Sequence, residues 1–137
     1  MRHRVKKVHL NRDYDHRRAL QRSLVRSFVM YGFIKTTKPK ALFARPKIEH
    51  LVEWGKLGDL DSRRRLLAEI PNKSIVSKFI EDAKIFDGRK GGYTRIINLG
   101  KRLGDKADMV RMEWSVQKKK EVKVEPSKEV KKETKNK

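Results

Sequence analysis

Residues 2–40, RHRVKKVHLNRDYDHRRALQRSLVRSFVMYGFIKTTKPK, decide how this chain folds and what kind of partner it needs. The stretch begins as a basic arm with little core-forming pattern and continues as an amphipathic helix. Residues 1–47 carry 14 Lys or Arg against only Asp13 and Asp15, a local net charge of +12 in a chain whose total is +20. Like charges at this density repel one another, so the pattern indicates a polyanionic partner that neutralises them.

In the arm itself, residues 1–12, the side chains of Val5, Val8 and Leu10 can bury little apolar surface. We expect such a segment to be disordered unless phosphates order it. Until a partner is identified, a solvated basic tail remains an open alternative. The candidate phosphate contacts in the arm are its basic and imidazole side chains: Arg2, His3, Arg4, Lys6, Lys7, His9 and Arg12.

A helix is predicted to begin near Tyr14, because Asp13 suits the N-cap and Asp15 places negative charge in the first turn, where the helix dipole favours it. The expected buried face consists of the apolar residues that recur at helical spacing: Leu20, Leu24, Phe28 and Tyr31.

The same helix carries Arg18, Arg22 and Arg26 at four-residue steps, which puts them roughly opposite that apolar face. Three stacked like charges disfavour an isolated helix, and a merely solvated face usually mixes signs. We therefore interpret the stripe as a phosphate-binding surface, extended by His16 and Arg17.

Residues 33–37 read as a short strand, and a helix is predicted from residue 40 to about residue 56. Pro46 should bend or split this helix, and Gly55 and Gly58 should end it. The basic residues here are candidates for a second set of contacts: Lys35, Lys38, Lys40 and Arg45.

Two further helices are expected, one beginning at Asp59 or Asp61 and one beginning at Asn72 or Ser74. The inner face of the second should consist of its regularly spaced apolar side chains: Ile75, Val76, Phe79, Ile80 and Ala83. This is the least basic region, and it reads as scaffold.

A glycine-rich loop at residues 86–95 then carries Arg89, Lys90 and Arg95. Tyr93 has two alternative interpretations that the sequence leaves open, a ring that stacks on a base or a core aromatic. Residues 93–99 and 109–116 are predicted to form an antiparallel hairpin around Gly104-Asp105. Its second strand should bury Val110, Met112, Trp114 and Val116, with Arg111 and Glu113 on the other face, where they pair with groups across the ladder.

Composition excludes several functional classes. Cysteine is absent, residues 1–20 lack the apolar stretch of a signal peptide, and no apolar run is long enough to span a bilayer. His3, His9, His16 and His50 lack zinc-site spacing, and the carboxylates are scattered. We expect no catalytic residues, metal or cofactor, and a cytoplasmic location.

Charge alone would also permit a DNA-compacting or regulatory protein; a nuclease would need a carboxylate cluster that the sequence does not offer.

The predicted organisation is a basic arm at 1–12, one α+β domain at 13–116 and a Lys/Glu-rich extension at 117–137. The extension repeats Glu every four residues, but Pro126 interrupts it and few of its residues are apolar. We expect it to be disordered in isolation.

Five motifs together resemble the bacterial ribosomal protein L17 family. They are MRHR at 1–4, LNRDYDHRRAL at 10–20, IKTTKPKA at 34–41, GGYTRI at 91–96 and RLGDKADM at 102–109. The resemblance covers residues 1–116 in order. Two departures are Trp114, where an aliphatic residue is usual, and the extension after Val116.

This resemblance implies a structural component of the large (50S) ribosomal subunit that binds large-subunit (23S-type) rRNA, with no catalysis, no DNA and no membrane as partner. It implies a two-layer fold with about four helices packed on a small, mainly antiparallel sheet, built from the strand after the first helix and the C-terminal pair. Contact with ribosomal protein L32 on the solvent side of the subunit is also implied.

Overall fold

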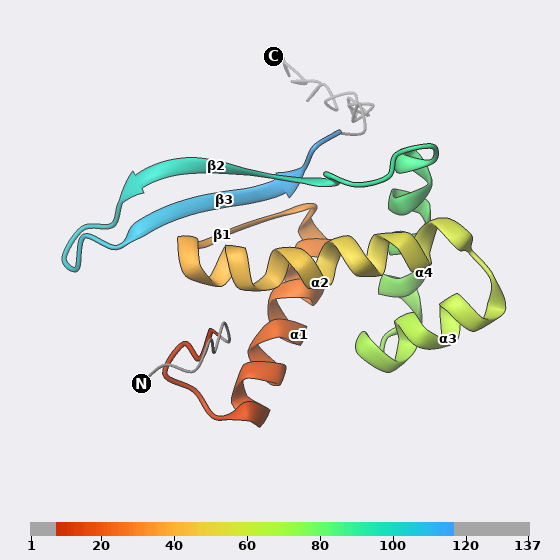
Figure 1. The fold of residues 1–137 in the computed structure, drawn as a ribbon, viewed down its shortest axis with the longest axis horizontal. Helices are drawn as coiled ribbons and strands as arrows, with labels where there is room; N and C mark the ends of the chain where they lie inside the picture. Colours follow the sequence, from red (N-terminus) through yellow and green to blue (C-terminus); the bar gives the residue numbers. More distant parts are fainter. Residues whose placement is uncertain (1–7, 117–137) are drawn as a thin grey trace, which may run out of the picture.

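A computed structural model describes residues 8–116, and its helices and strands form two layers. Figure 1 shows the sheet as one layer, with α2 lying along it and α1, α3 and α4 on the same side of the sheet. This confirms the predicted α+β class. The elements in chain order are α1 (Tyr14–Tyr31), β1 (Phe33–Thr37), α2 (Lys38–Leu57), α3 (Leu60–Glu69), α4 (Lys73–Ala83), the short 3-10 helix η1 (Lys84–Phe86), β2 (Thr94–Lys101) and β3 (Asp108–Trp114).

The three strands are ordered β1-β3-β2, and both pairings are antiparallel. Met112 of the central strand lies opposite Ile34 on one side and Ile96 on the other. Because side chains alternate along a strand, this register turns all three toward the helices. Ile34 and Met112 are buried there, and Ile96 is partly buried. The burial of Val110, Met112 and Trp114 confirms the prediction for the second hairpin strand, whereas the predicted burial of Val116 is wrong, since this residue lies beyond the end of β3 and is exposed.

The ends of α1 follow the sequence, but its buried face differs from the prediction. Asp13 occupies the N-cap in an extended conformation, without a side-chain capping bond, and Gly32 ends the helix at φ 75° with its N–H bonded to the Phe28 carbonyl. The buried residues are Val25, Phe28 and Val29. The predicted burial of Tyr31 is wrong, and this side chain is exposed. The buried face is rotated around the helix axis by about 100°, the angle between successive residues, from the face that the sequence predicted.

Helix α2 is continuous through Pro46, so of the two effects predicted for this proline, a bend or a split, the split does not occur. Gly58, at φ 70°, terminates the helix as predicted, but Gly55 does not. Gly55 is buried where α2 crosses α4. A Cβ built on it would lie 2.7 Å from Cβ of Ala83 and 3.2 Å from the Phe79 ring. The glycine is therefore required for the close approach of two helices.

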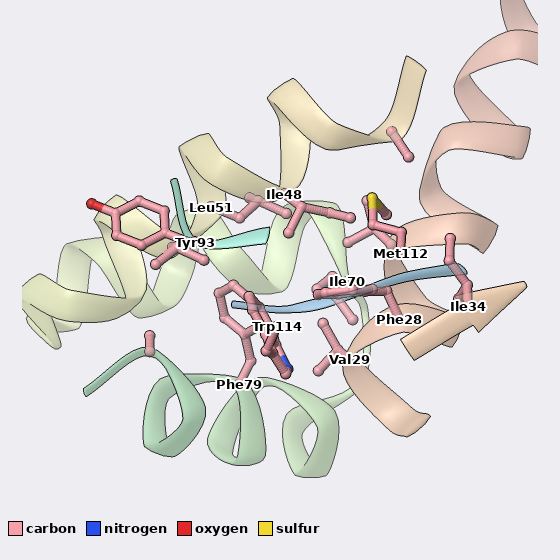
Figure 2. Close-up of a cluster of buried hydrophobic side chains, with 14 of the residues drawn as sticks. Phe28, Val29, Ile34, Ile48, Leu51, Ile70, Phe79, Tyr93, Met112 and Trp114 are labelled. Atoms are coloured by element: carbon pink, nitrogen blue, oxygen red, sulfur yellow. The ribbon is translucent and has the colours of Figure 1, made fainter. Parts of the chain in front are cut away.

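The core is centred on aromatic rings that surround Trp114 at the end of β3 (Figure 2). The Trp114 ring centroid lies 4.4 Å from that of Phe28, 5.5 Å from Phe86 and 6.2 Å from Phe79. One strand thus contacts rings from α1, α4 and η1, and Trp114 is a core residue as interpreted from the sequence. Between residues 8 and 116, no helix combines the length and apolar character that crossing a bilayer requires.

The contact between α2 and α4 generates a stability prediction. We expect Gly55→Ala to lower the free energy of unfolding by about 1–2 kcal/mol, because overpacking at a rigid helix crossing outweighs the gain in helix propensity. Urea unfolding of the RNA-free protein measures this. Adding Ala83→Gly removes the facing methyl group, so the double variant should lose less stability than the sum of the single variants. A neutral or stabilising Gly55→Ala would contradict the packing.

Candidate nucleic-acid interface

The end of the basic arm folds back onto the first turns of α1. Leu10 and Asn11 both adopt positive φ, 53° and 50°, which reverses the chain just before the helix. Arg17 then joins the two segments, since its guanidinium donates to the Arg12 carbonyl at 2.6 Å and lies 3.1 Å from Nδ1 of His9. The arm candidates at positions 2–7 (Arg2, His3, Arg4, Lys6 and Lys7) lie outside the described residues.

The Arg stripe of α1 borders the buried face rather than opposing it. The rotation of that face leaves Arg22 about 70° from the centre of the buried arc. Arg22 is consequently half-buried; its guanidinium lies 3.8 Å from the Glu69 carboxylate and 3.5 Å from the Ala68 carbonyl oxygen. Arg18 and Arg26 are exposed, as is His16 before them. The three arginines therefore differ in availability to a partner.

Glu69, at the end of α3, is a site residue that the sequence reasoning missed. Its carboxylate accepts a hydrogen bond from Lys47 at 2.6 Å. Desolvation by burial raises the pKa of Glu69, but the Lys47 hydrogen bond and the charges of Lys47, Arg22 and Arg18 outweigh that effect and leave the pKa below its ordinary value. Glu69 therefore stays ionised at neutral pH and holds cationic heads from two other helices in place.

The second basic set is spread over two surfaces. Lys38 is exposed and Lys40 half-buried in the first turn of α2, while Arg45 donates to Glu49 at 2.9 Å on the same helix. Lys35 is exposed on the sheet face that turns away from the helices, opposite Arg111 in the register. The structure thus does not gather these four candidates into one patch.

That outer sheet face contains a buried carboxylate. Glu113 is 3% exposed and lies 2.6 Å from the Arg95 guanidinium on β2 and 2.8 Å from that of Arg111. Arg111 also sits 4.2 Å above the ring of Phe33. The sequence predicted that Arg111 and Glu113 pair with groups across the ladder, and the Arg95 contact confirms this for Glu113. Arg95 is consequently engaged within the sheet.

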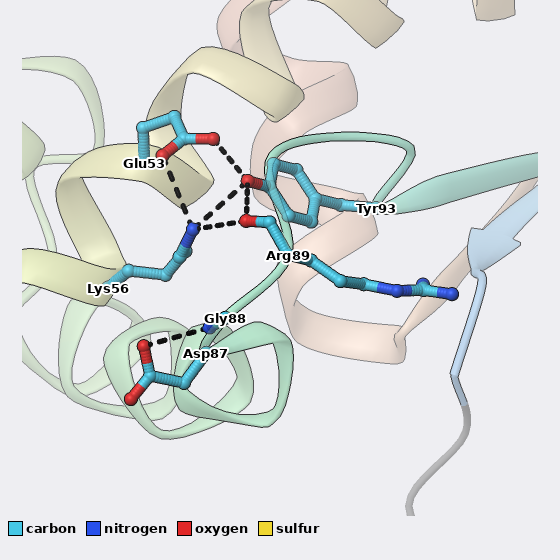
Figure 3. A network of polar contacts seen from close by, with 6 residues as sticks. All are labelled: Glu53, Lys56, Asp87, Gly88, Arg89 and Tyr93. Atoms are coloured by element: carbon cyan, nitrogen blue, oxygen red, sulfur yellow. Dashed lines mark hydrogen bonds and ion pairs between the residues drawn. The ribbon is translucent and has the colours of Figure 1, made fainter.

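The structure corrects the stacking interpretation of Tyr93, because this ring is 1% exposed and packs against Phe86 at 5.3 Å. A buried ring has no free face for a base. Its hydroxyl group instead joins a polar network (Figure 3) in which it donates toward the Glu53 carboxylate and the Arg89 carbonyl oxygen and accepts from Lys56 at 3.2 Å.

Lys56 completes that network by donating to the Arg89 carbonyl oxygen at 2.6 Å. The hydrogen bond to Tyr93 raises the pKa of Lys56, and burial together with the bond to Glu53 raises the pKa of Tyr93. The network fixes the glycine-rich loop to α2. Within this loop, the Lys90 side chain is exposed, and the Arg89 guanidinium donates to the Ser115 hydroxyl at 2.8 Å.

We expect Tyr93→Phe to lower the free energy of unfolding by about 1–2 kcal/mol, because the ring stays packed while a hydrogen bond to a charged group is lost. Tyr31→Phe is the matched control. Its ring is 69% exposed, so removing its hydroxyl group should leave stability within about 0.5 kcal/mol of the parent. Urea unfolding of both variants tests the network; equal effects would argue against it.

Comparison with known proteins identifies the family of this chain. Residues 20–115 match the family model for ribosomal protein L17. A relative from Hydrogenobaculum sp. is 45% identical over 116 residues, which cover 83% of this chain and 98% of the relative. A relative from Thermoanaerobacter sp. strain X514 is 47% identical over 105 residues, covering 76% and 94%. Both are named large ribosomal subunit protein bL17. The chain belongs to the ribosomal protein L17 family.

Proposed function

We propose that this protein is a structural constituent of the large ribosomal subunit and binds large-subunit rRNA through its basic arm and helix α1. The observation that carries the proposal is the net charge of +12 within residues 1–47. Family membership supports the subunit, since its relatives are named large ribosomal subunit proteins, and supports a structural rather than an enzymatic role.

The contacts expected of such a surface are with phosphates. Guanidinium and ammonium groups on α1 and at the start of α2 neutralise the RNA backbone and fix the position and register of the protein without reading base identity. Exposed Arg18, Arg26 and Lys38 are the described side chains best placed for this, because none of them forms an ion pair within residues 8–116. The arm adds five further candidates at positions 2–7.

The proposal includes neighbouring large-subunit proteins as partners, L32 among them, and a cytoplasmic location with the ribosomes. A DNA-compacting protein is the rival that charge alone would allow. For the nuclease alternative, no three His, Asp or Glu side chains in the described part of the chain are placed to hold a metal ion.

Sedimentation separates the two main candidates. In a cell lysate on a sucrose gradient, the chain should follow large ribosomal subunits and dissociate from them as salt is raised. Migration with the nucleoid would support the DNA-binding rival and overturn the proposal.

A pair of double variants tests the role of α1. We expect Arg18→Gln with Arg26→Gln to weaken binding to large-subunit rRNA and to reduce the slope of log affinity against log salt by about 1.5, because each lost phosphate contact removes roughly 0.7–0.9. Filter binding over a series of salt concentrations measures both quantities.

The matched control is Arg63→Gln with Arg64→Gln, which removes the same charge from exposed positions on α3. This control should keep most of the affinity and nearly the parental salt slope. If both double variants lose affinity equally, the effect is one of net charge and α1 is not the contact surface.

A further inference from the structure

A groove of about 500 Å³ lies between the N-terminal half of α1, the middle of α2 and the end of α3. One side of its lining is cationic and consists of Arg17, Arg18, Arg22 and Lys47, with Glu69 as the one carboxylate. Four cations against one anion leave the groove strongly positive. Glu69 holds Lys47 and Arg22 in fixed positions without neutralising the whole set.

The rest of the lining is apolar and aromatic. Phe43 and Leu51 from α2 line it, as do Tyr14 from the first turn of α1 and Val8 from the end of the arm. Tyr14 is 68% exposed, in the first turn of α1. A solvent-exposed aromatic ring next to four cations is not explained by core packing.

A groove with one cationic side and one apolar, aromatic side favours a particular kind of nucleic-acid ligand. A double helix keeps its bases stacked inside and presents only phosphates and groove edges, so it gains nothing from an apolar cavity. An unpaired nucleotide offers a phosphate for the cations and a flat base for the aromatic and apolar side chains. The groove volume also falls within the roughly 300–1,000 Å³ typical of small-molecule sites.

We infer that this groove binds an unpaired nucleotide of the rRNA, with the base against Tyr14 and the apolar lining and the phosphate against the cationic side. The inference rests on the proposed rRNA-binding function and adds to it. The α1 surface would then contact both duplex phosphates and one single-stranded position. Glu69 acts as a positioning residue, because its carboxylate holds the side chains of Lys47 and Arg22 in place.

The test compares two single-stranded probes of about ten nucleotides, within the site sizes of single-strand binders. One is an RNA of mixed sequence, and the other has the same backbone with base-free ribose spacers. Because both carry the same phosphates, the difference in affinity reports base contacts alone. We expect the full-length protein to bind the base-containing strand about tenfold more tightly, the size of one stacking contact.

Tyr14→Ala should reduce that preference to about twofold, with little effect on binding of the base-free strand. Tyr31→Ala is the matched control, because this tyrosine lies on the same helix, is 69% exposed and does not line the groove. It should keep the full preference. Circular dichroism of both variants checks that the helix is intact.

The outcomes separate this inference from the proposed function. If both probes bind equally and with steep salt dependence, or if Tyr14→Ala retains the preference, the groove assignment is wrong while rRNA binding stands. If neither probe binds and the chain does not sediment with large subunits, the proposed function fails as well.

Discussion

The structure depends on the position of β3 at the centre of the sheet. This strand pairs with β1 from the first third of the chain and with β2 just before it, and its Trp114 contacts rings on α1, α4 and η1. Helices α1 and α4 meet around this ring, through Phe28 and Phe79. Burying that cluster stabilises a chain with only 36% apolar residues, and the contact of Phe28 with Trp114 holds α1 against the sheet.

The few carboxylates decide which cations remain available to a partner. Glu49, Glu53, Glu69 and Glu113 each pair with a basic side chain of the domain. The pair of Glu69 with Lys47 joins α3 to α2, and Glu49 and Glu53 also accept hydrogen bonds from Thr94 and Tyr93, which tie α2 to the start of β2. Arg22, Arg45 and Arg95 are thereby partly committed to the fold. The positive charge left uncompensated is concentrated on the exposed side of α1 and the start of α2. Some basic side chains therefore stabilise the domain through ion pairs, and others remain available to an anionic partner.

Local patterns predicted most of the fold. Turn glycines, N-cap residues and period-two alternation located every α-helix and strand of the described residues within a few residues, because these signals act over short range; the 3-10 helix η1 was not predicted. Contacts between elements that are distant in sequence were harder to predict. The rotation of the buried arc of α1, the burial of Gly55 and Tyr93, and the pairing of Arg22 with Glu69 all depend on elements distant in sequence. For the site, residue type identified basic candidates, but the sequence carried no signal for which of them an acidic residue from another helix would engage.

The order of the strands has a consequence for how the domain is made. During synthesis α1, β1 and all the other helices leave the translating ribosome before β3 does, and β1 can find no hydrogen-bonding neighbour until residues 109–113 are present. Closing the sheet is thus a single late event that joins segments some 75 residues apart, a separation of the kind that slows folding. Until then the newly made chain is a set of basic helices with an unpaired strand, a state that a polyanion or a chaperone would encounter before the finished domain exists.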